Sequence, residues 1–136
     1  MSRILVVDDD PDILETLCYA LEQAGYAVET ASDGTAALVQ ARNQPPDLAV
    51  LDVMLPGLNG YEVSRLLKQE MRAARIPTFP ILMLTARRVS ASERIDFLTS
   101  WSQADDTLWK PYDLTTLLLR IQSLLEEARA SVGDTR

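Results

Sequence analysis

Histidine is absent from the 136 residues of this chain, and cysteine occurs once, as Cys18. Without imidazole, the chain cannot build a histidine-ligated zinc site, a Ser-His or Cys-His catalytic pair, or a phosphohistidine of its own. A single cysteine excludes a disulfide within the chain, as expected in a reducing compartment. The start MSRILVV meets acidic residues after a short apolar run, which fits neither a signal peptide nor a membrane span. We therefore expect a cytoplasmic protein that makes no membrane contact.

Positive charge is also scarce, because 13 lysines and arginines face 20 aspartates and glutamates, for a net charge of −7. This balance argues against general binding of nucleic acid or of an anionic membrane. A length of 136 residues with 47% hydrophobic residues suits one domain with a buried core. We assign residues 1–127 to that domain and expect the small, polar stretch 128–136 to be a frayed tail or the start of a linker. Such a tail fits both a stand-alone domain and the front of a longer chain.

Short apolar runs alternate with amphipathic stretches along the chain. The runs Ile4–Val7, Leu48–Leu51 and Ile81–Leu84 are apolar throughout, as in strands buried on both faces, and weaker strands are expected at 26–31 and 106–109. Helical patterns follow them, beginning near residues 11, 35, 61, 90 and 114. Five strands alternating with five helices predict an α/β domain with a parallel sheet covered on both sides. In such sheets the functional crevice lies outside the carboxyl ends of the strands.

Polar residues stand directly after four of the expected strands. Asp8 and Asp9 follow the first strand, Asp52 the third, Thr85 the fourth and Lys110 the fifth. A parallel sheet brings these ends together, so we expect the five side chains in one pocket. Clustered carboxylates suit a hard divalent cation such as Mg²⁺, which also accepts phosphate oxygens as ligands. The neighbouring lysine and hydroxyl suit a phosphoryl group, the lysine as a point charge and the hydroxyl as a donor.

The strand ends lie within the segments ILVVDDDPDIL, DLAVLDVMLPGLNGYEV, ILMLTA and LWKPYDL. With these segments in this order, the chain resembles a response-regulator receiver domain of bacterial two-component signalling, as in the chemotaxis receivers. The spacing of Asp9, Asp52 and Lys110 is close to the usual layout of that family. The resemblance implies a flavodoxin-like, doubly wound five-stranded parallel sheet in the order 2-1-3-4-5 with five helices. It also implies a switch controlled by phosphorylation rather than a turnover enzyme.

The resemblance assigns the phosphoacceptor and the metal ligands. Asp52 would take a phosphoryl group from a phosphohistidine of a sensor histidine kinase or a phosphotransfer protein. The carboxylates of Asp8, Asp9 and Asp52, with the backbone carbonyl of Met54, would hold Mg²⁺ or Mn²⁺. A cation between these acids would explain why they are crowded at one strand end.

The resemblance also assigns the groups that bind the phosphoryl oxygens and change position. Lys110 would pair with Asp52 at rest and with a phosphoryl oxygen afterwards. Thr85 would swing toward the phosphoryl group and pull the following loop with it. The peptide bond that precedes Pro111 is expected to be cis.

Several positions around the site depart from the family pattern or vary within it. The family usually has an aromatic residue three positions before the lysine, where this chain has Thr107. Trp109 shares the strand face of Thr107 by alternation, and we expect it to take over part of the aromatic role. Met54 and Arg87 lie two positions after Asp52 and Thr85, and we expect both to shield an acyl phosphate from water.

The expected output surface consists of the fourth helix, the fifth strand and the fifth helix, through which the family controls a partner or effector domain. The last helix, YDLTTLLLRIQSLLEE, resembles that of receivers fused to winged-helix DNA-binding domains, which pair through this surface by salt bridges. Asp105, Asp106 and Arg120 fit those salt bridges, so a homodimer is one prediction. The stretch before Asp105 is longer than usual and has Gln103 where the family commonly has glycine, which predicts a rebuilt region around the fourth helix.

Two other functions fit parts of the sequence. A phosphohydrolase with an aspartate nucleophile would use Asp8 and Asp10 in an Asp-x-Asp pattern, but Asp12 stands where threonine or valine is expected and no cap domain fits. A protein-interaction module that keeps the fold but signals without phosphorylation is the other, and Thr107 favours it. The substitution Asp52→Asn separates the receiver from the phosphohydrolase, because only the receiver needs Asp52 as its nucleophile.

Overall fold

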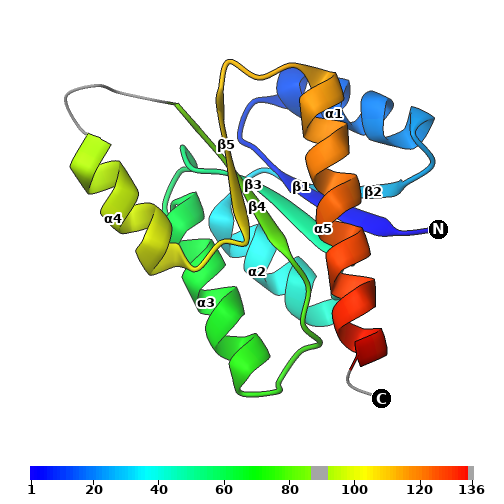
Figure 1. Ribbon diagram of the computed structural model, residues 1–136. Helices are drawn as coiled ribbons and strands as arrows, with labels where there is room; N and C mark the ends of the chain where they lie inside the picture. Colours follow the sequence, from blue (N-terminus) through cyan, green and yellow to red (C-terminus); the bar gives the residue numbers. More distant parts are fainter. Residues whose placement is uncertain (87–91, 135–136) are drawn as a thin grey trace.

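The computed structural model describes residues 1–86 and 92–134, in which strands and helices alternate (Figure 1). The strands are β1 (Arg3–Val7), β2 (Ala27–Ala31), β3 (Leu48–Asp52), β4 (Ile81–Ala86) and β5 (Asp106–Lys110). The helices are α1 (Pro11–Gln23), α2 (Gly34–Asn43), α3 (Gly60–Arg72), α4 (Ser92–Ser102) and α5 (Leu114–Asp134). Every predicted element is present, and apart from the end of α5 the bounds lie close to the predicted ones.

The strands form one parallel sheet in the order β2-β1-β3-β4-β5. Helices α1 and α5 cover one face, and α2 and α3, with α4 beside α3, cover the other (Figure 1). The predicted flavodoxin-like sheet is therefore confirmed. The direction of winding reverses between β1 and β3, because β2 lies on one side of β1 and the later strands on the other. The carboxyl ends of β1 and β3 thus flank the point at which such sheets bind ligands.

Two apolar layers hold the helices to the sheet. Alternate residues of a strand point to opposite faces, so Leu5 and Val7 join the layer under α2 and α3, whereas Ile4 and Val6 join the layer under α1 and α5. The second layer also takes buried side chains from its two helices, namely Leu17, Leu21, Leu117, Ile121, Leu124 and Leu125. Burial on both faces is the reason that the central strands consist of continuous apolar runs.

Side-chain caps determine where α1 and α3 begin. Asp10 accepts a hydrogen bond from the backbone N–H of Asp12, and Pro11 occupies the first helical position. At α3, Asn59 and Glu62 form the reciprocal bonds of a capping box. The carboxylate of Asp10 therefore serves the helix, although it follows directly after the acids of β1.

Helix α5 continues to Asp134, so the stretch predicted as a frayed tail is helical over residues 128–134. Ala128, Arg129 and Ala130 are strong helix formers, which explains why the helix does not end near 127. Arg129 also donates a 2.8 Å hydrogen bond to the hydroxyl of Ser2, which connects this end of α5 to the start of the chain. Like the other described helices, α5 lacks the combination of length and apolarity that is needed to cross a membrane.

Candidate functional site

The sheet brings Asp8, Asp52, Thr85 and Lys110 to one edge. Asp8 directly follows β1, Asp52 ends β3, Thr85 lies near the end of β4 and Lys110 ends β5. Only 2% of Asp8, 3% of Asp52 and 3% of Thr85 is exposed. Burying a charge is costly unless it is paired and hydrogen-bonded, so the partners of the two acids decide what this edge can do.

Both carboxylate oxygens of Asp52 have partners. The Nζ atom of Lys110 lies 2.5 Å from Oδ2, and the backbone N–H of Met54 donates to Oδ1 over 2.7 Å. These bonds compensate for burial of the carboxylate and hold it in one orientation. Lys110 thereby connects β5 to β3, two strands that are not neighbours in the sheet.

The buried carboxylate of Asp8 has fewer hydrogen-bond partners than that of Asp52. Its Oδ1 accepts a 2.9 Å hydrogen bond from the backbone N–H of Asp10, whereas its Oδ2 is buried with no hydrogen-bond partner. Burial raises the pKa of Asp8 to about 6; the Asp10 N–H opposes this rise, and the Asp52 carboxylate adds to it. Above this pH the carboxylates of Asp8 and Asp52 share the positive charge of Lys110.

The pKa values of Lys110 and Tyr112 both depend on the carboxylates of Asp8 and Asp52. Burial by itself would lower the pKa of Lys110, but the hydrogen bond to Asp52 and the charges of Asp52 and Asp8 outweigh burial and raise it. Burial raises the pKa of the Tyr112 phenol; Lys110 opposes this effect, and both carboxylates add to it. At neutral pH the pocket thus contains an ammonium and a neutral phenol. Sequence reasoning did not single out Tyr112, which is separated from Lys110 only by Pro111, and the Lys110–Pro111 bond is cis.

The residues present fit a divalent cation. Asp9 is exposed, and the described part of the chain contains no group of three acidic or cysteine side chains close enough to hold a metal. Mg²⁺, however, needs only one or two protein carboxylates, since water and phosphate oxygens complete its shell. Asp8 and Asp52 are two such carboxylates, and the unpartnered Oδ2 of Asp8 is an oxygen that a cation would satisfy. The acids at the ends of β1 and β3 are therefore compatible with the predicted magnesium site.

The predicted modulators lie around these strand ends. Met54 lies two residues after Asp52, and 65% of its surface is exposed. Thr107 and Trp109 flank buried Leu108 on β5, so that both lie on the opposite face of the strand from Leu108. Arg87 lies outside the residues that the structure describes.

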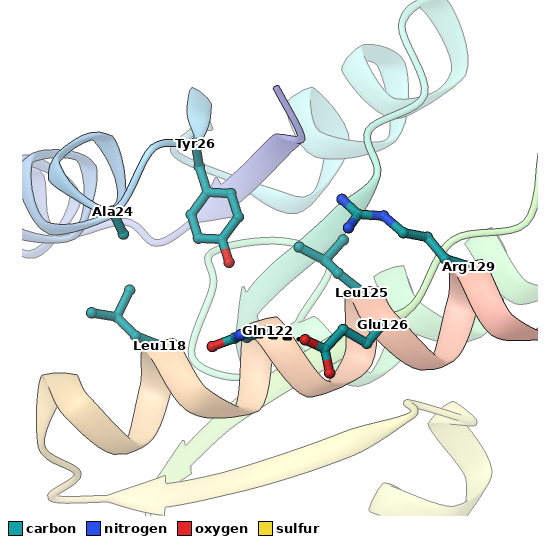
Figure 2. Close-up of a pocket in the computed structure, with 7 residues that line it drawn as sticks. All are labelled: Ala24, Tyr26, Leu118, Gln122, Leu125, Glu126 and Arg129. Atoms are coloured by element: carbon teal, nitrogen blue, oxygen red, sulfur yellow. Dashed lines mark hydrogen bonds between the residues drawn. The ribbon is translucent and has the colours of Figure 1, made fainter.

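A groove of about 360 Å³ lies elsewhere, between the end of α1 and the second half of α5 (Figure 2). The ring of Tyr26 points toward α5, where the side chain of Gln122 donates a 3.3 Å hydrogen bond to Glu126 (Figure 2). The lining residues are Ala24, Tyr26, Leu118, Gln122, Leu125, Glu126 and Arg129. None of the strand-end residues lines this groove, so it is not part of the site.

The response regulator receiver domain family matches residues 4–122, a span that includes every strand end described above. The chain belongs to this family. A receiver is a module of phosphorylation-based signalling in two-component systems, and the four strand-end residues occupy the positions that the sequence resemblance assigned to its chemistry.

Curated relatives of this receiver are response regulators. The alkaline phosphatase synthesis transcriptional regulatory protein PhoP of Bacillus subtilis is 43% identical over 135 residues, which cover 98% of this chain and 52% of PhoP. The response regulator MprA of Mycobacterium leprae is 46% identical over 127 residues, which cover 93% of this chain and 52% of MprA. The receiver thus spans about half the length of the curated relatives it matches.

Solved receiver structures share the fold. The signal receiver domain of a histidine kinase from Syntrophus aciditrophicus superposes with a TM-score of 0.85 at 30% identity, covering 93% of this chain and 92% of that one. The chemotaxis protein CheY4 of Vibrio cholerae gives a TM-score of 0.76 at 31% identity, covering 91% and 98%. This receiver is therefore similar in structure to a chemotaxis receiver over nearly its full length.

Family membership and geometry together disfavour the phosphohydrolase. That enzyme would need Asp8 and Asp10 as a pair of acids in one active site. In this receiver the carboxylate of Asp10 accepts from the N–H of Asp12 as the cap of α1. Asp8 instead interacts with Asp52 of β3.

Gly60 is a residue of this site to which the sequence assigned no functional role. A Cβ atom at Gly60 would lie 2.4 Å from the backbone oxygen of Asp52 and 2.9 Å from the Cα of Val53. The N–H of Gly60 also donates to the carbonyl of Val53 over 3.0 Å. The start of α3 therefore packs against the backbone of Asp52 at a distance that only glycine permits. Nothing in the segment PGLNG signals this contact, because it arises between two elements of the fold.

Proposed function

We propose that this receiver accepts a phosphoryl group on the carboxylate of Asp52 from a phosphohistidine of a sensor histidine kinase or a phosphotransfer protein. The observation that carries the proposal is the pairing of buried Asp52 with Lys110 at 2.5 Å and with the Met54 N–H at 2.7 Å. An acid held in one orientation by a cation and a backbone donor is preorganised for transfer of a negatively charged group.

In the proposed reaction, an oxygen of the Asp52 carboxylate forms a bond to phosphorus while the bond from phosphorus to the imidazole nitrogen of the donor breaks. The imidazole leaves and takes a proton from solvent, and Asp52 becomes an acyl phosphate. Lys110 then binds a phosphoryl oxygen in place of the carboxylate oxygen. Later attack of water on the acyl phosphate releases inorganic phosphate, so the domain acts as a self-resetting switch rather than as a turnover enzyme.

The proposed cofactor is Mg²⁺, or Mn²⁺, held by Asp8, Asp9 and Asp52 and by the backbone carbonyl of Met54. The ion would supply positive charge that offsets the repulsion between these carboxylates and the incoming phosphoryl group. The buried, unpartnered Oδ2 of Asp8 and the raised pKa of Asp8 support this assignment. Exposed Asp9 lies next to Asp8 at the rim, where it can complete the set from the solvent side.

Thr85 is proposed to bind a phosphoryl oxygen through its hydroxyl and to change the chain that follows β4. Its strand neighbour Trp109 would pass the change to β5, since Thr107 cannot serve as the usual aromatic. The surface of α4, β5 and α5 would then switch between two arrangements. Met54 and Arg87 are proposed to shield the acyl phosphate from water and so to lengthen its lifetime.

The output partner is proposed to be an effector domain or a separate protein that contacts α4, β5 and α5. Two relatives are the transcriptional regulatory protein PhoP of Bacillus subtilis and the DNA-binding dual master transcriptional regulator RpaA of Synechocystis. This chain spans about half the length of those relatives and carries a net charge of −7. We therefore propose that it controls an output located elsewhere and does not itself bind nucleic acid. A cytoplasmic location is proposed on the same grounds.

A homodimer through the same surface is a further proposal. Arg120 pairs with Asp106 at 2.8 Å and Lys68 pairs with Asp105 at 2.5 Å, both within one chain. Asp105, Asp106 and Arg120 are the three residues that the family resemblance assigns to contacts between protomers. If those residues form salt bridges between protomers, Asp105 and Asp106 must first release Lys68 and Arg120 of their own chain.

Intact-protein mass after incubation with acetyl phosphate and Mg²⁺ tests the proposed function. We expect one phosphoryl adduct that requires Mg²⁺ and is absent from Asp52→Asn. Asp12→Asn is the matched control, because Asp12 is an exposed acid in the first turn of α1. It should keep the adduct. Failure of every phosphodonor to form the adduct would contradict the proposal and favour a module that signals without phosphorylation.

A further inference from the structure

The loop between β3 and α3 supplies one of the two partners of the Asp52 carboxylate. The backbone N–H of Met54 donates to Oδ1 of Asp52 over 2.7 Å. This bond can orient the carboxylate only if the peptide group that carries the N–H is itself held in one orientation. The carbonyl of Val53 belongs to the same planar peptide group and points the opposite way, so whatever holds that carbonyl also aims the Met54 N–H.

Two backbone N–H groups hold the carbonyl of Val53. The N–H of Leu55 and the N–H of Gly60 each donate to it over 3.0 Å. Gly60 is the first residue of α3, where backbone N–H groups have no acceptor within the helix and can bind one outside it. The start of α3 is therefore connected, through a single peptide group, to the side chain of Asp52.

A capping box fixes the backbone around Gly60. The side chain of Asn59 accepts a hydrogen bond from the N–H of Glu62 over 3.0 Å, and Oε1 of Glu62 accepts from the N–H of Asn59 over 3.2 Å. Gly60 lies between these two residues, so both bonds restrain it. Loss of the Glu62 side chain would remove the acceptor of the Asn59 N–H and weaken the first turn of α3.

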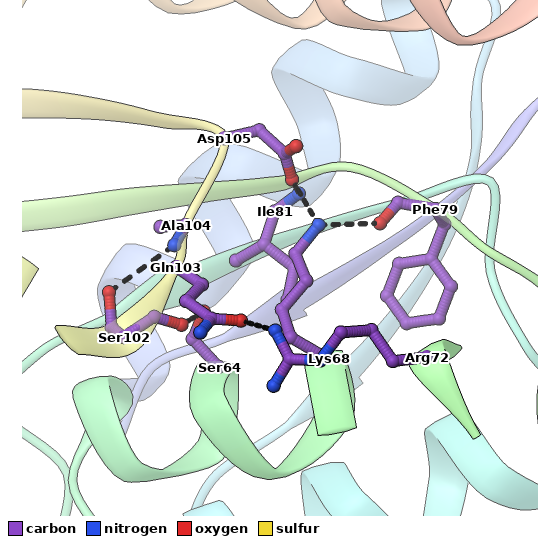
Figure 3. Close-up of polar contacts among 9 residues, drawn as sticks. All are labelled: Ser64, Lys68, Arg72, Phe79, Ile81, Ser102, Gln103, Ala104 and Asp105. Atoms are coloured by element: carbon purple, nitrogen blue, oxygen red, sulfur yellow. Dashed lines mark hydrogen bonds and ion pairs between the residues drawn. The ribbon is translucent and has the colours of Figure 1, made fainter. Parts of the chain in front are cut away.

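The rest of α3 is anchored independently of this cap (Figure 3). The hydroxyl of Ser64 donates to the backbone oxygen of Ser102 over 2.9 Å, and Nζ of Lys68 lies 2.5 Å from Oδ2 of Asp105. Ser64 and Ser102 are completely buried, and a buried hydrogen bond is expensive to leave unmade. A change at Glu62 should therefore loosen the first turn of α3 without displacing the body of the helix.

We propose that Glu62 is a positioning residue for the phosphorylation of Asp52. Its carboxylate holds the N–H of Asn59 and thereby restrains Gly60. Gly60 in turn holds the peptide group whose N–H orients the Asp52 carboxylate. The role in the reaction rests on the proposed function, whereas the hydrogen bonds themselves require no phosphoryl donor.

Hydrogen exchange at the Met54 amide tests the positioning in the absence of Mg²⁺ and of any phosphodonor. In Glu62→Ala this amide should exchange about fivefold faster, because a capping bond is lost. Glu62→Gln should exchange at the wild-type rate, since glutamine forms the same bond in a capping box. Unaltered exchange in Glu62→Ala would overturn the proposal. Equally fast exchange in Glu62→Gln would trace the effect to charge and would overturn it as well.

Asp113→Ala is the matched control for a general loss of stability. The carboxylate of Asp113 accepts from the N–H of Thr116 over 2.8 Å at the start of α5, so this variant loses a bond of the same kind from a helix on the other face of the sheet. Urea titrations should show similar losses of stability for Glu62→Ala and Asp113→Ala. Exchange at Met54 should nevertheless be normal in Asp113→Ala. Equal acceleration in the two variants would overturn the positioning role.

The rate of modification by acetyl phosphate and Mg²⁺ connects the positioning to the reaction. Glu62→Ala should react about threefold more slowly or worse, because fewer molecules hold the Asp52 carboxylate in the reactive orientation, and Glu62→Gln should restore the rate. An unchanged rate beside faster Met54 exchange would overturn Glu62 as a positioning residue. Absence of an adduct from the wild-type protein would contradict the proposed function and, with it, the role in phosphorylation. The Met54 exchange would then still show whether Glu62 orients Asp52.

Discussion

Thr85 of β4 and Trp109 of β5 are register partners in the parallel ladder. Such partners have their side chains on the same face of a sheet. Thr107, which occupies the position where receivers usually have an aromatic residue, pairs with Met83 instead. Trp109 is therefore the aromatic residue that a movement of Thr85 reaches directly.

The first prediction is that the fluorescence of Trp109 changes when a phosphate analogue binds. The protein has two tryptophans, so Trp101→Phe leaves Trp109 as the one reporter. Beryllofluoride with Mg²⁺ should shift its emission and its quenching by acrylamide, because the environment beside Thr85 changes. Thr85→Ala should remove the response. An unaltered spectrum and unaltered quenching in the Trp101→Phe protein would refute a readout through Trp109.

Millimolar Mg²⁺ should raise the melting temperature, because a ligand that binds only the folded chain stabilises it by mass action. At a concentration about tenfold above the dissociation constant the gain is about 1.4 kcal/mol, which corresponds to several degrees. Calorimetry with and without the ion measures it. Asp8→Asn should lose most of the gain, since it removes one of the two buried carboxylates. Equal melting temperatures of the wild-type protein would count against a cation site.

Without Mg²⁺, ionisation of Asp8 should destabilise the fold as the pH rises. The pKa of Asp8 is about 6 in the folded protein and 3.8 ordinarily, so the folded chain holds this proton more tightly and stability falls with pH between these values. The loss from Asp8 alone is about 3 kcal/mol. Urea titrations in EDTA at several pH values should show this loss as the difference between wild type and Asp8→Asn. Parallel pH profiles of the two proteins would contradict it.

Gly60→Ala should both destabilise the protein and impair phosphorylation. The new Cβ would lie 2.4 Å from the Asp52 backbone oxygen, so the backbone must move at a cost of about 1–3 kcal/mol. Gly57→Ala is the control: its φ of 72° is unfavourable for alanine by about 1–2 kcal/mol, but no atom lies within 4 Å of the added Cβ. Denaturation and the rate of acetyl phosphate modification measure both effects. An equal loss of rate in the two variants would show that the contact with Asp52 is unimportant.

Some departures from the family pattern found in the sequence have a physical resolution in the structure. Gln103, where glycine is common, adopts φ of 61°, the left-handed conformation that glycine adopts easily. Its side chain accepts from Arg72, a contact that partly compensates for the backbone strain. Asp105 and Arg120, assigned to contacts between protomers, have partners within the chain, because α3 and β5 bring Lys68 and Asp106 to them.

The sequence by itself determined the sheet, the order of elements and the residues at the strand ends. The strand ends were predictable because a strand buried on both faces is apolar along its length, so Asp8 and Asp52 mark where β1 and β3 end. Local signals were sufficient for α1 as well, whose cap at Asp10 is formed within its own first turn. Periodicity and capping are properties of neighbouring residues, and they appear in the sequence directly.

Only the tertiary structure decided how tightly these pieces meet. The contact of Gly60 with the Asp52 backbone, the stacking of Arg65 on Trp101 and the missing partner of Asp8 each depend on distances between elements far apart in the chain. The same is true of the Trp109–Thr85 register. Packing and desolvation act between surfaces that exist only after folding, and no residue pattern along the chain encodes their distances.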